Sequence, residues 1–152
     1  MRKIFKAKIL PPTYFLFIML ATGMAHLLFP IVKINRPVFN FIGIVLIALG
    51  IGVNIWADNL FKKQNTTVKP YERPSALQVA GPFKISRHPM YLGMAMILFG
   101  VSFILGSAIA FLFPVIFIYI INTAFIPVEE DNLTKVFKKE YLMYKKNVRR
   151  WI

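Results

Sequence analysis

Residues 90–126, "MYLGMAMILFGVSFILGSAIAFLFPVIFIYIINTAFI", contain no charged side chain. They form two apolar runs, roughly 90–105 and 108–126, joined by "LGSA" at 105–108. Each run is near the roughly 17 to 25 residues that a helix needs to cross a bilayer core, with the first on the short side. Because the link is so short, we expect the two helices to form a tight antiparallel hairpin.

Two further apolar runs, roughly 12–32 and 38–60, precede this hairpin. Hydrophobic residues make up 57% of the 152-residue chain, more than a soluble globule of this size can hide. Unpaired backbone groups are not tolerated in lipid, and four segments cannot close a barrel, so the runs must be helices. We therefore expect an all-α integral membrane protein with four transmembrane helices in one domain, 1–152, with a cytoplasmic loop at 61–89. The first run lacks a clear cleavage site, which favours a retained span over a signal peptide.

The Lys and Arg residues lie almost entirely on one side of these four runs. Four lie in the N-terminal tail, six in the loop before Pro89 and seven after Glu130, whereas the two links on the other side hold two and none. By the positive-inside rule, both termini are cytoplasmic. The absence of eukaryotic sorting signals favours a prokaryotic plasma membrane. The net charge of +13 therefore indicates a partner surface of lipid, and no nucleic acid is expected to bind. The sequence does not indicate an oligomeric state.

Small residues and prolines give further expectations about packing. Ser102, Gly106 and Ala110 around the turn, and Ala48 with Gly52 in the second run, recur at spacing four, which lets helix backbones approach closely. Pro114 should kink the fourth span or free a carbonyl, and Pro127 should end it. Residues 128–148 predict an amphipathic helix that lies on the cytoplasmic surface or packs against the hairpin. Its apolar residues recur at helical spacing: Leu133, Val136, Phe137, Tyr141, Tyr144 and Val148.

Polar residues gather at the cytoplasmic ends of the hairpin. "SRHPMYLG" places Arg87, His88 and Tyr91 at the start of the third span, and "PVEED" places Glu129 and Glu130 after the fourth. A hairpin brings its two ends together, so these five residues should converge at one interfacial site. The alternative is structural: Arg and Tyr as interface anchors, and acids complementing a helix dipole.

Several kinds of site can be weighed against these residues. The chain contains no Cys, and the spacing of its His and Glu residues matches no known metal pattern, so no metal is expected. It also lacks a nucleophile elbow and the glycine-rich loops of nucleotide sites. The residues alone therefore predict a cytoplasmic-facing membrane site for a charged ligand.

"SALQVAGPFKISRHPMYLG" at 75–93 and "EEDNLTKVFKKEYLMYKKNV" at 129–148 resemble the isoprenylcysteine carboxyl methyltransferase family and its relatives, the phospholipid N-methyltransferases. These are integral-membrane enzymes that use S-adenosylmethionine. The resemblance covers about residues 54–148 and implies a methyltransferase acting on a small lipophilic or lipid-linked substrate. It implies cofactor contacts from these residues: Ser75, Ala76, Leu77, Gln78, Phe83, Arg87, His88, Pro89, Met90, Tyr91, Glu129 and Glu130.

The resemblance also bears on the acceptor. The prenylcysteine enzymes carry an Arg four residues before the first Glu of the pair, where this chain has Phe125. The resemblance therefore disfavours a prenylcysteine carboxylate. Methyl transfer to the acceptor would depend on positioning rather than on a strong base, so no catalytic residue is assigned. Two other functions stay open: an NADPH-dependent sterol-reductase-like membrane enzyme, and a non-catalytic four-helix membrane interaction protein.

Overall fold

The computed structural model describes residues 10–29, 37–64 and 74–152, and within these ranges it is helical with no strand. The longer helices are α1 (Pro11–Leu28), α2 (Pro37–Lys63), α3 (Pro89–Leu105), α4 (Leu112–Ile120) and α5 (Ile126–Asn147). Short turns of 3₁₀-helix, η1 (Gly81–Lys84) and η2 (Ala108–Phe111), precede α3 and α4, and a π-helical turn, η3 (Ile121–Phe125), joins α4 to α5. The N-terminal tail, the link at 30–36 and the part of the cytoplasmic loop at 65–73 lie outside the described residues.

Three of these helical stretches are long and apolar enough to cross a membrane. They are α1, α2 and the continuous run Ala108–Asn147, whose apolar part comes first. Helix α3 is apolar too, but its 17 residues extend only about 26 Å, a little short of the roughly 30 Å of a bilayer core. The prediction of an all-helical fold is thus confirmed, and the described residues contain three candidate membrane spans.

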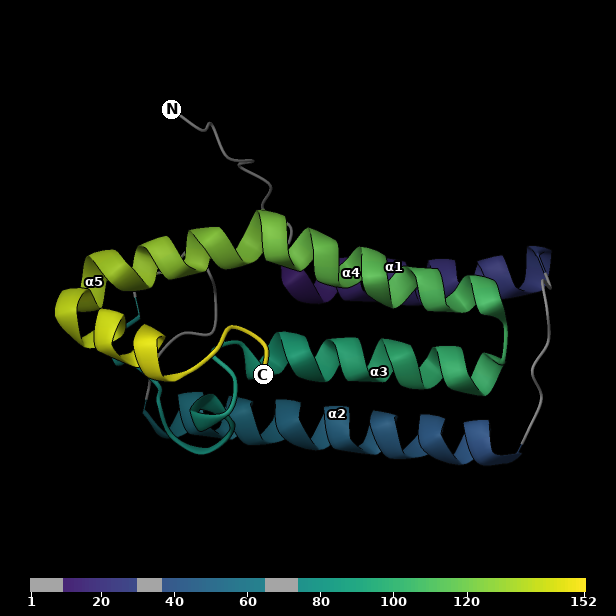
Figure 1. Ribbon diagram of the computed structural model, residues 1–152, viewed down its shortest axis with the longest axis horizontal. Helices are drawn as coiled ribbons and strands as arrows, with labels where there is room; N and C mark the ends of the chain where they lie inside the picture. Colours follow the sequence, from purple (N-terminus) through teal and green to yellow (C-terminus); the bar gives the residue numbers. More distant parts are fainter. Residues whose placement is uncertain (1–9, 30–36, 65–73) are drawn as a thin grey trace.

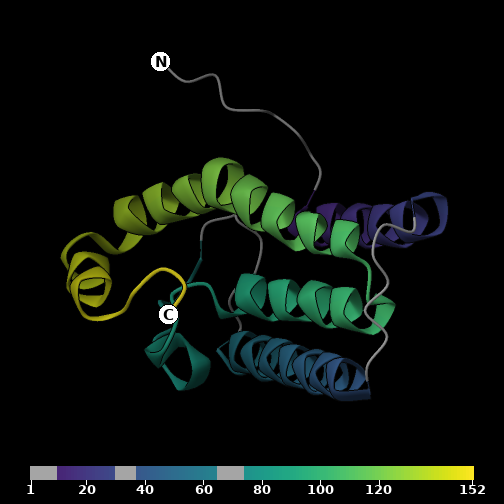
Figure 2. The same ribbon diagram turned by 45° about the vertical axis from the view of Figure 1, so that its right-hand side comes forward.

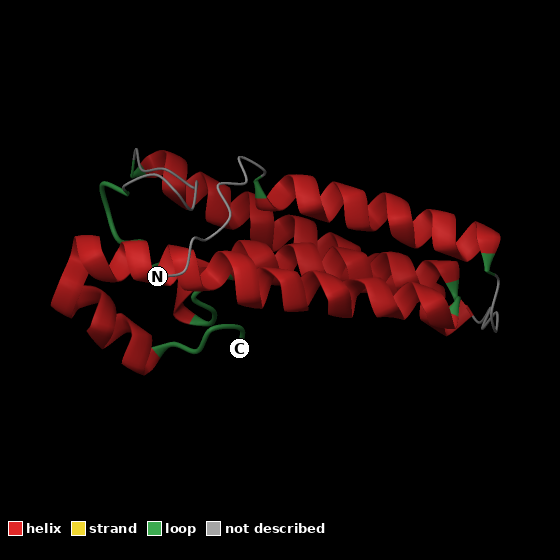
Figure 3. Ribbon diagram, turned by 90° about the horizontal axis from the view of Figure 1, so that it is seen from above, coloured by secondary structure: helices red, strands yellow, loops and turns green. Residues whose placement is uncertain are grey.

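The helices lie roughly side by side in two layers (Figures 1 and 3), α2 with α3 and α1 with α4. Between the layers, Ile18 of α1, Leu98 of α3 and Phe117 of α4 form part of a continuous buried core. Tyr14 of α1 meets Phe125 edge-on, with ring centroids 5.3 Å apart. This core fixes the end of α4 against α1 and α3, and so sets where α5 begins.

Helices α2 and α3 lie side by side (Figure 2), and glycines form their close contacts. A methyl group at Gly50 would lie 2.5 Å from the Gly93 carbonyl oxygen, and one at Gly43 would lie 2.6 Å from that of Gly100. Both contacts are closer than real side chains tolerate, so only glycine permits this helix separation. The prediction that Ala48 and Gly52 form the close contact is wrong: Ala48 is exposed, and nothing lies within 4 Å of a Cβ at Gly52.

The turn after α3 depends on three residues that the sequence singled out. Gly106 ends α3 in the left-handed conformation, with φ of 61°. Pro114 has no N–H to donate to the Ala110 carbonyl four residues earlier, and the Ser102 hydroxyl lies 2.8 Å from that oxygen instead. Pro114 thus frees a carbonyl, and Ser102 satisfies it from the neighbouring helix.

The end of the fourth run differs from the prediction. Pro127 does not end the helix: it occupies the first turn of α5, where a missing N–H is tolerated, and the chain continues as helix. The irregularity falls one turn earlier, in η3, where the ladder widens to π-helical spacing. The predicted amphipathic helix at 128–148 is broken at Lys138 (φ 45°, ψ −115°), and the chain folds back toward the start of α3 (Figure 1).

Candidate functional site

The segment that leads into α3 is held by its own backbone and by the C-terminal tail. Gly81 has φ of 58°, which allows the tight 3₁₀ turn of η1. The Ser86 hydroxyl accepts from the His88 N–H at 3.2 Å and lies 3.1 Å from the Arg150 carbonyl, to which it donates. The Arg87 N–H donates to the Arg149 carbonyl at 3.0 Å. The tail therefore closes over the residues that precede α3.

A cavity opens beside this segment. Four helical elements and the segment before α3 contribute to it: α2, η1, α3 and, through its first turn, α5. The residues that line it are Phe61, Phe83, Arg87, His88, Pro89, Met90, Tyr91 and Glu129. All of these except Phe61 are residues that the resemblance implied as cofactor contacts.

Glu130 lies next to the cavity and is surrounded by cations. Its side chain is 7% exposed, and Arg87 Nη2 approaches Oε1 at 3.0 Å. Arg150 approaches both oxygens, with Nε 3.2 Å from Oε1 and Nη2 3.1 Å from Oε2, while Lys145 Nζ lies 3.0 Å from Oε2. Burial alone would raise the pKa of the Glu130 carboxyl, but His88 and these cations hold it far below its usual range. Glu130 is therefore ionised, and its oxygens already bind side chains of the same chain.

Glu129 has a different environment. Its side chain is 27% exposed, lines the cavity, and places Oε2 3.5 Å from His88 Nδ1. His88 Nε2 lies 3.5 Å from Glu130 Oε1, so the buried ring stands between two carboxylates. Burial opposes the charged imidazolium, yet the two carboxylates outweigh it and raise the pKa of His88 above 6.5. At 3.5 Å these are ion-pair contacts rather than hydrogen bonds.

Several buried polar atoms around the cavity have no hydrogen-bond partner within the described part of the chain. They are Arg87 Nε and Nη1, both ring nitrogens of His88, and Glu129 Oε2. A buried polar group that makes no hydrogen bond costs about 1–3 kcal/mol, and the ion-pair contacts of His88 at 3.5 Å leave these hydrogen-bonding positions open to a ligand. Donors and an acceptor thus face one small cavity, a set that suits a ligand with both anionic and donor groups.

Aromatic rings complete the cavity wall. Phe83 is buried and meets Phe61 edge-on at 5.3 Å, and Tyr91 stacks on His88 at 5.7 Å with 15° between the planes. Faces of aromatic rings attract cations, so this wall favours a positively charged ligand group. Phe61 was missed from the sequence because it closes an apolar run and carries no motif.

The stretch Ser75–Gln78 does not line this cavity. Gln78 is buried, and its Oε1 accepts from the backbone N–H groups of Val79 and Ala80 at 3.1 and 3.3 Å, which caps the turn before η1. Gln64 Nε2 also donates to this Oε1 at 3.4 Å, whereas Gln78 Nε2 donates to no acceptor among the described residues. The assignment of Ser75, Ala76, Leu77 and Gln78 as cofactor contacts stays a prediction.

The tail contributes contacts that sequence reasoning did not find. The Tyr144 hydroxyl donates to the Phe83 carbonyl at 2.7 Å, and burial raises the pKa of this phenol far above its usual range, so it remains a donor. Arg150 Nη1 also donates to Asn122 Oδ1 in η3 at 3.0 Å. No spacing rule links Arg150 to an acid twenty residues earlier, since the chain reverses at Lys138 between them.

The comparison with protein families adds an independent finding. A sequence model described as phospholipid methyltransferase matches residues 38–140, which is more than half of the chain. The chain belongs to the phospholipid methyltransferase family. It is also 43% identical over 63 residues to an uncharacterized protein of Haemophilus influenzae, covering 41% of this chain and 100% of that relative. No solved structure matches the chain.

The family consists of membrane methyltransferases, and the apolar helices of this chain agree with that class. The matched residues include every wall of the cavity, from Phe61 of α2 to Glu129 of α5. They do not include α1 or the tail that carries Lys145 and Arg150. The cations that surround Glu130 thus come partly from outside the recognisable family sequence.

Proposed function

We propose that this chain is an S-adenosylmethionine-dependent methyltransferase that acts on a small lipophilic or lipid-linked acceptor at the cytoplasmic surface of a membrane. In this proposal α3 is a fourth span, paired with α4 in a hairpin, and both termini are cytoplasmic. The observation that carries the proposal is the set of buried Arg87, His88 and Glu129 atoms that make no hydrogen bond within the described residues, around one cavity in a member of this family.

These residues fit the groups of S-adenosylmethionine. The Arg87 guanidinium can bind its carboxylate, and Glu129 Oε2 can accept from its amino or hydroxyl groups. Phe61, Phe83 and Tyr91 offer ring faces that favour its positive charge. When bound, the cofactor supplies an activated methyl group with a good leaving group. The chain's own residues would then hold the reactants in line and exclude water, since no strong base stands free in the cavity.

The surroundings of Phe125 support an acceptor without a carboxylate. Phe125 is 3% exposed and packs on Tyr14, so this position offers a ring instead of the Arg that the resemblance leads one to expect. A carboxylate placed there would lose its hydration without gaining a cation. A less anionic lipid-like nucleophile, entering from the bilayer, is compatible with an apolar residue at this position.

Calorimetry of the detergent-purified full chain with S-adenosylhomocysteine, and in parallel with NADPH, tests the proposal. We expect heat of binding with the first and none with the second. Absence of heat with S-adenosylhomocysteine at millimolar concentration would refute the cofactor assignment, and binding of NADPH alone would favour the reductase alternative.

Two matched variants sharpen this test. Glu129→Gln removes a charge that faces the cavity and should weaken S-adenosylhomocysteine binding by about 10- to 100-fold, the value of a lost charged hydrogen bond. Asp131→Asn removes the same charge two residues away, where the carboxylate is exposed and pairs with Lys135, and should leave binding unchanged. Equal effects of the two variants would mean that only net charge matters, contrary to a direct role for Glu129.

A further inference from the structure

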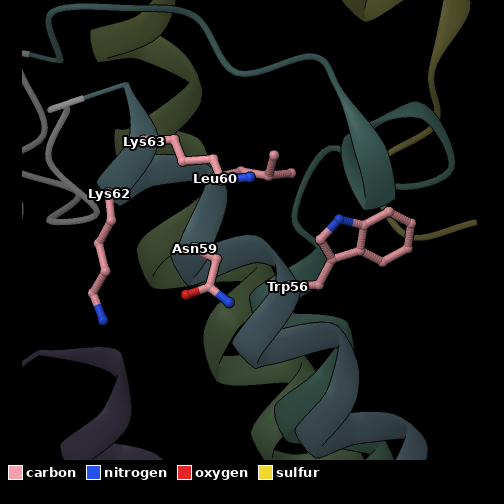
Figure 4. A pocket seen from close by; sticks show the side chains of 5 residues that line it. All are labelled: Trp56, Asn59, Leu60, Lys62 and Lys63. Carbon is pink, nitrogen blue, oxygen red and sulfur yellow. The ribbon is translucent and has the colours of Figure 1, made fainter.

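A second cavity lies at the cytoplasmic end of α2, facing away from the candidate site. It is lined by Trp56, Asn59, Leu60, Lys62 and Lys63 (Figure 4). Phe61, between Leu60 and Lys62 in sequence, lines the other cavity. The two cavities share no lining residue and are separated by the last turns of α2.

The polar groups of this second cavity are mainly hydrogen-bond donors. The indole of Trp56 and the two ammonium groups of Lys62 and Lys63 can only donate, and the amide of Asn59 donates through its nitrogen. The nearby Asp58 carboxylate forms an ion pair with Lys62, with Nζ 2.6 Å from Oδ2. The charge left over is therefore positive, and a donor-rich positive groove is complementary to an oxygen anion such as a phosphodiester.

Trp56 is held in place although its ring is open to the surroundings. It is 53% exposed, and a Cβ at Gly81 would lie 3.0 Å from Cε2 of its ring. With φ of 58°, position 81 is one that glycine occupies without strain, and the absence of a side chain there leaves room for the indole. The backbone of η1 thus fixes one wall of the groove.

The groove continues into the apolar surface of α2. Ile55 and Ile51 lie one and two turns before Asn59 on the same face of the helix, and they are 58% and 45% exposed. This helix is one of the candidate spans, so that face meets acyl chains, and its end with Trp followed by Lys is typical of the membrane interface. An occupant with an anionic head and an apolar tail matches both parts, which a free anion does not.

We infer that the groove formed by Trp56, Asn59 and Lys63 at the end of α2 binds the phosphodiester headgroup of an anionic phospholipid. Lys63 supplies the unpaired positive charge, Lys62 lies at the edge of the groove in its ion pair with Asp58, and the acyl chains follow Ile55 and Ile51 along the helix. The inference concerns a lipid bound beside the protein, on the opposite face of α2 from the candidate active site, and it does not depend on the proposed methyl transfer.

Fluorescence quenching by brominated lipids tests this site, because Trp56 is one of only two tryptophans. In a Trp151→Phe background, the full chain is titrated in mixed micelles with brominated phosphatidylglycerol or brominated phosphatidylcholine. We expect half-maximal quenching at a several-fold lower fraction of the anionic lipid. The double variant Lys62→Gln/Lys63→Gln should reduce this preference by about fivefold per lysine.

A matched control removes the same two charges elsewhere. Lys139→Gln/Lys146→Gln lie at exposed positions of the tail and should keep the preference. Equal quenching by the two lipids, or equal loss of preference in the two double variants, would overturn the inference and leave Trp56 as an interface anchor. Recovery of fluorescence on adding millimolar glycerol phosphate would show that the groove takes a free phosphate, which would also overturn the assignment to a lipid.

Discussion

The tail that folds back onto Glu130 should contribute measurably to stability through Arg150. Arg150→Ala removes a forked pair of bonds to both Glu130 oxygens and the bond to Asn122. Bonds to charged groups contribute about 1.5–3 kcal/mol when buried, but exposed pairs contribute only about 0–1 kcal/mol. Since the Arg150 side chain is 34% exposed and Glu130 keeps Arg87 and Lys145, we expect a loss of about 1–2 kcal/mol.

Removing the acid should cost more than removing this one base. Glu130→Gln leaves Arg87, whose side chain is 7% exposed, without its carboxylate partner. Breaking a buried pair from one side typically costs about 3–5 kcal/mol. The expected order of destabilisation is therefore Glu130→Gln, then Arg150→Ala, with Arg150→Lys smallest because a point charge keeps one of the bonds.

Thermal unfolding in detergent, followed by circular dichroism, measures this order. For a chain of this size, 1 kcal/mol corresponds to a midpoint shift of roughly 2–4 °C. Arg149→Ala is the matched control, because its side chain is exposed and its contact with Arg87 uses the main-chain carbonyl. A midpoint for Arg150→Ala equal to that of Arg149→Ala, or lower than that of Glu130→Gln, would refute the reasoning.

Three further predictions follow from the packing and the charges. Gly50→Ala should destabilise the chain by about 1–3 kcal/mol through overpacking on α3, whereas Gly52→Ala, which faces open space, should be neutral or slightly stabilising; unfolding midpoints compare them. Because the pKa of Glu130 is lowered, its stabilisation is complete above pH 4.5 and is lost as the pH falls below that value. Because the pKa of His88 is raised, its stabilisation is complete below pH 6.5 and is lost as the pH rises through the pKa of His88 in the folded state. Unfolding midpoints measured from pH 4 to 9 should therefore be highest in mildly acidic solution. The variant His88→Gln should abolish the decline on the alkaline side. Tyr144→Phe removes the hydroxyl that donates to η1 and should cost about 0.5–1.5 kcal/mol; an unchanged midpoint would mean that this bond is replaced by water.

Long-range hydropathy and local turn chemistry predicted much of this molecule. The first three apolar runs became helices whose described ends lie within about four residues of the expected ones, whereas the fourth continues as helix beyond Pro127. His88 lies 3.5 Å from Glu129, so the two residues expected at one site do lie together. These inferences succeeded because they rest on lengths and on chain connectivity. Both are properties of the sequence itself and need no knowledge of which faces pack together.

The failures concern contacts that depend on helix rotation or on chain reversal. The glycines that join α2 to α3, such as Gly43 with Gly100, recur at spacing seven, and no local feature distinguished them from Ala48 and Gly52. Lys138 has a positive φ, which strains a lysine, and nothing in the sequence predicts such a conformation there. The reversal of α5 could therefore not be predicted from the sequence.

Because the chain reverses at Lys138, residues beyond the segment that matches the family contact the candidate site. The family match stops at residue 140, yet Arg150 and Lys145 lie beyond it and hold an acid within it. A chain shortened to the matched region would keep every cavity residue while leaving Glu130 with fewer counter-charges. A comparison restricted to the matched segment would thus leave out two of the three cations that hold Glu130 in this chain.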